Sequence, residues 1–124
     1  MTPPPSPGRS PFADPSVDRS ATEISRLLAA DEVTIVDVRE PHERELSAIP
    51  GAMHMPIDRV ASLADSLDWS RPVVFHCRLG WRAGMVATAF RAIGRDAVNL
   101  EGGIQAWVGA GYPVEPAGAA IADH

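Results

Sequence analysis

The sequence lacks lysine altogether and contains a single cysteine among its 124 residues. All eleven basic residues are arginine, so the chain has no lysine for Schiff-base chemistry and none for a P-loop nucleotide site. One cysteine cannot form a disulfide within the chain, and it cannot supply the several thiolates of a structural zinc site. These absences exclude three kinds of site and leave one thiol to be explained.

Positive charge and long apolar runs are also scarce. Eleven arginines stand against sixteen acidic residues, which gives a formal net charge of -5. Proteins that bind nucleic acid or anionic membranes need a basic surface, so this balance argues against both partners. No apolar run approaches the ~20 residues that span a bilayer. We therefore expect a cytoplasmic protein that acts on small molecules.

Length and composition predict one domain between two tails. With 45% hydrophobic and 22% charged residues, the chain has an ordinary globular composition. Six prolines occur in the first fifteen residues, where they fix φ and remove backbone donors, so a disordered tail is predicted over residues 1–15. The chain end is small and polar, which predicts a flexible tail over residues 116–124. The domain is expected over residues 16–115.

Strand and helix patterns alternate through the predicted domain. Strands are expected at residues 33–38, 52–55, 73–77 and 97–100. Helices are expected at residues 22–28, 41–46, 58–67, 82–93 and 104–108. Strands separated by helix-length connections predict an α/β fold with a parallel sheet covered on both faces. In such sheets, ligands bind beyond the carboxyl ends of the strands.

Cys77 is expected at one of these carboxyl ends. A short loop containing Gly80 follows it, and a helix begins near Arg82. The free N–H groups of a helix N-terminus and of a tight loop favour an anion, and Arg78 and Arg82 add positive charge. Such surroundings lower the pKa of a thiol from about 8.5 to roughly 3.5–7.5. The pattern predicts a reactive thiolate, although a buried structural cysteine is the alternative.

Five short motifs, in order along the chain, resemble the rhodanese homology domain. They are VDVR at 36–39, IPGA at 49–52, CRLGWR at 77–82, LEGGIQAW at 100–107 and GYPV at 111–114. Each motif is weak alone, but together they cover most of the predicted domain. The resemblance implies a single-domain rhodanese with a five-stranded parallel sheet flanked by helices on both faces.

The same resemblance implies a thiosulfate sulfurtransferase that requires no metal or organic cofactor. Cys77 would take the sulfane sulfur of thiosulfate, or of a related persulfide donor, and pass it to a thiol or cyanide acceptor. The implied substrate-binding residues are Arg78, Leu79, Gly80, Trp81 and Arg82. Because the chain has no second cysteine, the resolving thiol would come from another molecule.

Two other functions remain open at this point. Cysteine phosphatases and arsenate reductases of related architecture place an arginine six positions after the cysteine, whereas Arg82 follows Cys77 by five. The shorter loop forms a smaller cradle, which suits a single sulfur better than a tetrahedral oxyanion. Rhodanese-like domains also serve as sulfur carriers or regulatory binding modules, usually with the cysteine replaced, and Cys77 is present here.

Several polar residues near the predicted site have structural interpretations. Asp37 and Arg39, at a strand end, are expected to support the site through an ion pair, since a buried carboxylate needs a partner; substrate contact is the alternative. Strand alternation points His76 away from the side of Cys77, which favours packing under the loop. A charged run is expected to be solvated, with one member possible at the pocket rim. This run consists of Glu40, Glu43, Arg44 and Glu45.

Overall fold

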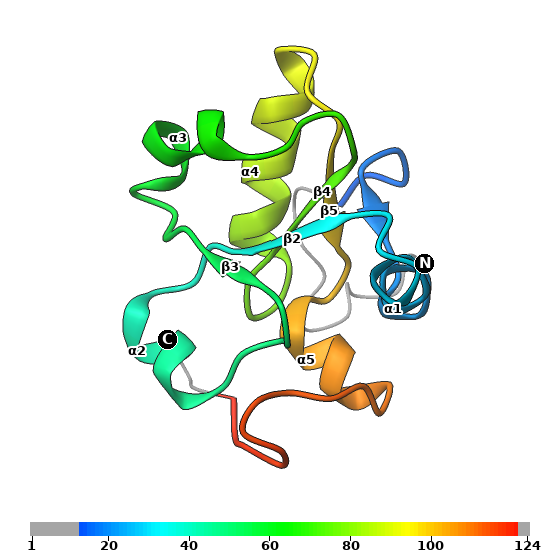
Figure 1. Cartoon of the computed structure of the whole chain (residues 1–124), viewed down its shortest axis with the longest axis vertical. Helices are drawn as coiled ribbons and strands as arrows, with labels where there is room; N and C mark the ends of the chain where they lie inside the picture. The colour runs from blue at the N-terminus through cyan, green and yellow to red at the C-terminus, as the bar shows by residue number, and fades with distance from the viewer. Residues whose placement is uncertain (1–12, 122–124) are drawn as a thin grey trace, which may run out of the picture.

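The computed structural model describes residues 13–121 and contains one five-stranded sheet (Figure 1). The strands are β1 (Asp18–Arg19), β2 (Thr34–Asp37), β3 (Met53–His54), β4 (Val73–His76) and β5 (Ala97–Leu100). Their order across the sheet is β1-β5-β4-β2-β3, and every neighbouring pair is parallel. The predicted parallel sheet is therefore confirmed, with β4 at its centre.

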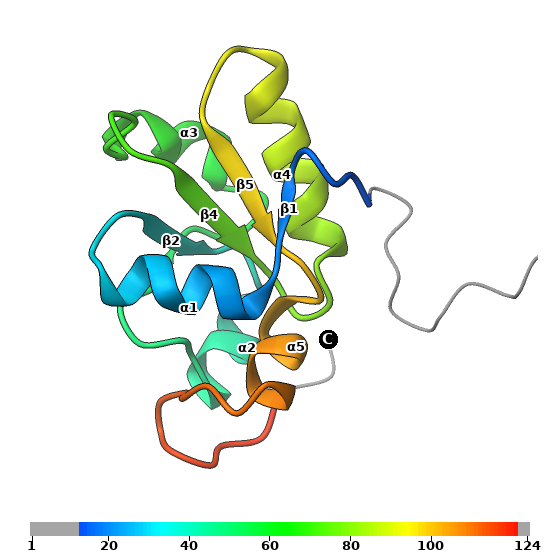
Figure 2. The same cartoon turned by 90° about the vertical axis from the view of Figure 1, so that its right-hand side faces the viewer.

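Residues 13–121 also form five α-helices and one short 3-10 helix. They are α1 (Ala21–Ala29), α2 (Pro41–Leu46), α3 (Val60–Leu63), η1 (Ala64–Ser66), α4 (Trp81–Ala92) and α5 (Gly103–Gly109). In Figures 1 and 2, α3 and α4 lie on the upper side of the sheet, while α1 and α5 lie on the lower side. None of the helices described between residues 13 and 121 is long and apolar enough to cross a membrane.

Strand alternation divides the core into two apolar clusters, one on each face of the sheet. In β4, Phe75 packs with α3 and α4, whereas Val74 packs with α1 and α5. In β2, Val36 belongs to the same cluster as Phe75, and Ile35 belongs to the same cluster as Val74. Successive side chains of a strand point to opposite faces, so an uninterrupted apolar run serves both clusters. The resulting three layers explain why the strands read as continuous β-branched segments.

Local sequence signals account for several element ends. The Ser20 side chain accepts a hydrogen bond from the Glu23 amide at 3.1 Å and caps α1. Pro41 begins α2, where its missing N–H costs nothing. The helix expected at 58–67 is present as α3 and η1, which together span less of the chain. The predicted boundaries are thus correct for α2, whereas those of the helix expected at 58–67 are too wide.

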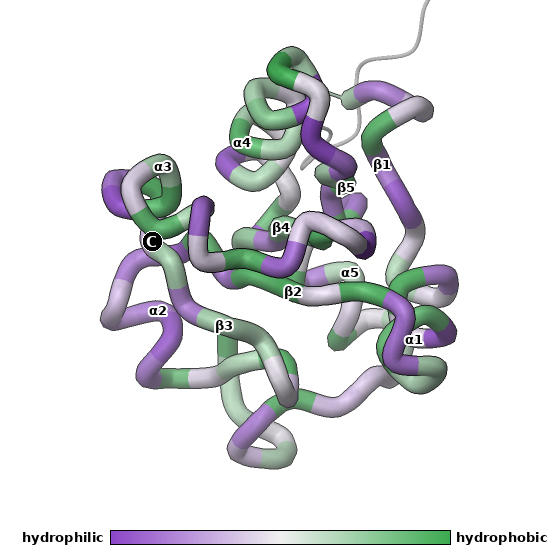
Figure 3. Tube along the Cα trace, turned by 45° about the horizontal axis from the view of Figure 1, so that its top comes forward, coloured by the Kyte–Doolittle hydropathy of each residue, from purple (hydrophilic) through white to green (hydrophobic). Residues whose placement is uncertain are grey.

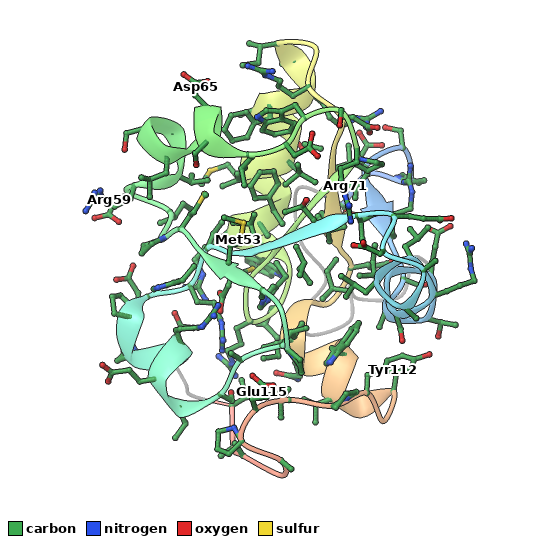
Figure 4. All side chains as sticks on the ribbon, in the orientation of Figure 1. Met53, Arg59, Asp65, Arg71, Tyr112 and Glu115 are labelled. Atoms are coloured by element: carbon green, nitrogen blue, oxygen red, sulfur yellow. The ribbon has the colours of Figure 1, made fainter. Side chains whose placement is uncertain are left out.

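The sheet edge and the chain end contain the features that local patterns did not reveal. Strand β1 has only two polar residues, so it carries no apolar run that would predict it. Glu115, labelled in Figure 4, forms an antiparallel bridge with Ala48 through bonds of 2.8 and 2.9 Å. Of the two predicted tails, residues 1–12 and 122–124 lie outside the described part of the chain.

Candidate active site

Cys77 directly follows β4, and backbone amides of the next segment point at its sulfur. Sγ accepts hydrogen bonds from the Gly80 amide at 3.1 Å and the Ala83 amide at 3.4 Å. Gly80 caps α4 in the left-handed region, with φ of +95°, and this turn directs its N–H back toward the strand end. Cys77 is 1% exposed and belongs to the apolar cluster that includes α3 and α4, and these two amides are the donors directed at its sulfur there.

The N-terminus of α5 holds the backbone of this loop from the other side. The Ile104 amide donates to the Cys77 carbonyl at 2.9 Å, and the Gln105 amide donates to the Arg78 carbonyl at 3.1 Å. Gly103 lies against the same peptide, so closely that an added Cβ would stand 2.4 Å from the Arg78 oxygen. Gly103, the first residue of α5, therefore permits a close backbone contact that supports the Cys77 loop.

Replacing Gly103 with alanine should cost about 2–4 kcal/mol of stability, because the new methyl group collides with backbone and φ is +61°. Gly94→Ala is the matched control, since Gly94 also has positive φ but nothing within 4 Å of its Cβ position. That control should lose only about 1 kcal/mol. Urea unfolding measures both, and equal losses would contradict the contact described above.

Asn99 of β5 connects the loop to the edge strand β1. Its Nδ2 donates to the Gly80 carbonyl at 3.2 Å and to Asp18 Oδ1 at 2.9 Å. Asn99 is 3% exposed, and its Oδ1 has no hydrogen-bond partner. Sequence reasoning missed this residue, although a single amide within a buried apolar strand is itself a signal of a specific contact.

Arg82, in the first turn of α4, forms a two-point ion pair with Glu43 of α2. Its Nη1 lies 2.7 Å from Glu43 Oε2, and its Nη2 lies 2.9 Å from Oε1. The Glu43 side chain is fully buried, so the prediction of a solvated charged run is wrong for this residue. In Figure 3 most of α2 is hydrophilic, and hydropathy therefore could not single out its one buried carboxylate.

The ion pair shifts both of its partners toward their charged forms. Burial opposes ionisation of Glu43, but hydrogen bonds from Arg82 and from the Glu40 amide outweigh it and lower the pKa of Glu43. The same carboxylate raises the pKa of Arg82 through its hydrogen bonds. The Arg82 guanidinium is therefore present as a fixed cation whose charge is matched at close range.

Asp37 and Arg39 form a second, fully buried ion pair at the carboxyl end of β2. Arg39 Nη2 lies 2.8 Å from Asp37 Oδ2, and it also donates to the Ser47 carbonyl at 2.6 Å. Arg44 Nη1 stands 3.7 Å from the same Asp37 oxygen. Burial opposes ionisation of Asp37, yet the hydrogen bonds and the charge of Arg39 help to outweigh it and lower the pKa of Asp37. The pair joins β2 to the segment after α2, as a structural role requires.

His76 lies beneath the Cys77 loop and contacts this buried pair. Its Nε2 is 3.8 Å from Asp37 Oδ2, and its Nδ1 is 3.3 Å from the Cys77 carbonyl oxygen. Burial disfavours the imidazolium, and this effect outweighs the attraction of Asp37, which lowers the pKa of His76 to about 4. The ring is therefore neutral at pH 7 and packs against the back of the loop.

The pKa of His76 predicts acid sensitivity between pH 6.5 and 4.5. The unfolded chain binds a proton there that the folded protein excludes, so stability is complete above pH 6.5 and falls as the pH is lowered. The loss should reach about 2 kcal/mol at pH 4.5. His76→Phe should remove this slope in urea unfolding measured across the range. Parallel slopes for the two proteins would contradict the prediction.

The structure brings the predicted loop residues to one place. Arg78 and Leu79 are half-buried, and Trp81 is 41% exposed at the start of α4. Between residues 13 and 121, no group of three or more histidine, cysteine, aspartate or glutamate side chains is placed to hold a metal ion. The site thus contains one sulfur, two main-chain donors directed at it and an arginine paired with a buried carboxylate.

These features define a class: α/β domains that present one cysteine in a strand–loop–helix turn at the centre of a parallel sheet. The family model "Rhodanese-like domain" matches residues 20–110. The chain therefore belongs to the rhodanese-like domain family. Several relatives of the chain are sulfurtransferases by name. At the level of the family, the protein is therefore a transferase.

Two curated relatives and one solved structure illustrate the similarity. The putative sulfurtransferase YtwF of Bacillus subtilis strain 168 is 34% identical over 88 residues, which are 71% of this chain and 85% of that protein. A sulfurtransferase of Allochromatium vinosum is 33% identical over 90 residues, covering 72% and 84% respectively. The crystal structure of a rhodanese-related protein from Thermoplasma volcanium has a TM-score of 0.73 at 28% identity, covering 79% of this chain and 96% of that chain.

Proposed function

We propose that this protein is a thiosulfate sulfurtransferase that works through a persulfide on Cys77. It moves a sulfane sulfur from thiosulfate, or from a related persulfide donor, to a thiol or cyanide acceptor. The observation that carries the proposal is the convergence of the Gly80 and Ala83 amides on Cys77 Sγ. Donors aimed at a sulfur atom stabilise a thiolate, which is the nucleophilic form of cysteine.

The proposed reaction consists of two nucleophilic displacements. The Cys77 thiolate attacks the outer sulfur of thiosulfate, a new S–S bond forms, and sulfite leaves with the electron pair of the broken S–S bond. The acceptor then attacks the outer sulfur of the persulfide and releases the Cys77 thiolate. A cyanide acceptor leaves as thiocyanate, and a thiol acceptor leaves as a persulfide. Main-chain donors near Sγ stabilise the negative sulfur before and after each transfer.

The other predicted residues receive roles consistent with their positions. The loop residues Arg78, Leu79, Gly80, Trp81 and Arg82 bind the donor and admit it to a sulfur that is 1% exposed. Asp37 and Arg39 support the site from beneath by holding the ends of β2 and the segment after α2. No metal or organic cofactor takes part. Because Cys77 is the sole cysteine, the accepting thiol belongs to another molecule.

Mass spectrometry after exposure to thiosulfate tests the proposal directly. One sulfur should add about 32 Da to the protein, and fragmentation should place the adduct on Cys77. Sulfite release in equal amount would show that the donor bond has broken. Cyanide should then remove the adduct and yield thiocyanate. If neither thiosulfate nor a small-molecule persulfide forms the adduct, the proposal is wrong.

A further inference from the structure

The ion pair between Arg82 and Glu43 lies at the start of α4, the helix whose Ala83 amide contacts the Cys77 sulfur, and it joins parts of the chain that are 39 residues apart. Both carboxylate oxygens of Glu43 meet guanidinium nitrogens, at 2.7 and 2.9 Å. Glu43 is fixed further by the Glu40 amide, which donates to its Oε2 at 2.8 Å. The Glu43 side chain is fully buried, and that of Arg82 is 19% exposed. This is a constrained, two-point contact with little room for rearrangement.

The position of Arg82 makes its charge relevant to the sulfur. Arg82 immediately precedes Ala83, whose amide donates to Cys77 Sγ, and its guanidinium interacts electrostatically with Cys77. Cys77 otherwise belongs to an apolar cluster, where a nearby charge is poorly screened. The charge of Arg39 lowers the pKa of Glu43, and the charge of Glu40 raises the pKa of Arg82. The ion pair therefore interacts electrostatically with a small group of charged side chains.

We propose that Glu43 balances the charge of the Cys77 loop: by pinning Arg82 and offsetting its cation, it limits both the stabilisation of the thiolate and the affinity for doubly charged donors. Main-chain amides then hold the sulfur, and the site accepts singly charged persulfides as well as thiosulfate. The statement about donors rests on the proposed function, whereas the statement about the thiolate requires only that Cys77 ionises.

The sign of the effect separates a charge role from a structural one. Glu43→Gln keeps the size of the side chain and one accepting oxygen, while leaving the Arg82 charge unmatched. The thiolate should then be more stable, and the neutral reagent iodoacetamide should alkylate Cys77 about threefold to tenfold faster at pH 6. A residue that only positions the loop would produce the opposite result, since displaced amides stabilise the thiolate less.

Three further variants complete the alkylation experiment, measured as rate against pH. Arg82→Gln leaves the Glu43 charge unmatched and should slow alkylation at pH 6 about threefold to tenfold. The double variant restores neutrality and should react within about twofold of the wild type. Glu45→Gln makes the same change on an exposed residue of α2 and should leave the profile unchanged. The double variant contains no unpaired buried charge, so it provides a test if a single variant does not fold.

Steady-state kinetics then test the statement about donors. Glu43→Gln should lower KM for thiosulfate at least about threefold, with a much smaller change for a singly charged persulfide donor. An unchanged or slower alkylation rate for Glu43→Gln, or a double variant slower than both single variants, would overturn the inference. If the alkylation rates follow the expected signs but wild-type protein forms no persulfide, the proposed function fails while the charge role stands.

Discussion

Replacing Cys77 with serine should lower thiosulfate:cyanide sulfurtransferase activity at least about a thousandfold. A serine hydroxyl stays protonated at neutral pH, and an oxygen nucleophile cannot form the persulfide that both half-reactions share. The Gly80 and Ala83 amides would remain in place but would have no anionic sulfur to stabilise. Thiocyanate production over time, measured at saturating donor and acceptor, gives the size of the loss.

The matched control for this experiment is Cys77→Ala, which should be equally inactive. Both substitutions are small changes in a well-packed position, so far-UV circular dichroism and thermal unfolding should show folded proteins in each case. Activity of either variant close to that of the wild type would remove Cys77 from the mechanism. Activity retained only by serine would show that a hydroxyl can replace the thiol, which persulfide chemistry does not allow.

Asp37→Asn should destabilise the protein by about 3–5 kcal/mol, the range found when a buried ion pair loses one charge. The Arg39 guanidinium is fully buried, and its Nη1 has no hydrogen-bond partner, so the cation depends on Asp37 for compensation. An amide can still accept a hydrogen bond from Arg39, but it cannot offset the charge. Urea unfolding at pH 7 measures the difference.

Asp31→Asn provides the matched control, because the same chemical change is made in an exposed ion pair. Asp31 Oδ1 lies 3.0 Å from Arg71 Nη2, and its side chain is 92% exposed. Asparagine tolerates the positive φ of 54° at this position. Water solvates the Asp31 carboxylate, and Arg71 also donates to the Val33 carbonyl, so the loss should be less than about 1 kcal/mol. Similar losses at positions 31 and 37 would show that burial does not govern the contribution of Asp37.

Most of the fold can be predicted from the alternation of strand-like and helix-like apolar patterns along the chain. The largely apolar runs that form β2, β4 and β5 are long enough to be recognised as strands and too short for helices. The connecting segments carry helical spacing, and a parallel arrangement follows from their length. Strand β1 could not be predicted in this way, because its two polar residues show no apolar alternation. Its place is set by pairing with β5, where Asp18 lies opposite Asn99.

The candidate site also has a part that local sequence predicts and a part that depends on residues far apart in the sequence. The Cys77 loop was predicted because strand, glycine and helix start occur within a few residues, and this local order directs the amides toward the sulfur. The roles of Glu43 and Asn99 could not be predicted. Each depends on a partner far away in the sequence, and a glutamate in a charged helix has the same local pattern whether it is solvated or buried.

The amino-acid sequence by itself determined the α/β architecture, the position of the single cysteine after a central strand, and the family, because these depend on short-range periodicity and on motifs. The tertiary structure alone decided which charges meet at the site. Arg82 could have had only solvent around it, but the fold places Glu43 of α2 beside its guanidinium. The physical reason is that the free energy of a buried charge depends on its neighbours in space, and chain folding selects those neighbours over separations that no local pattern records.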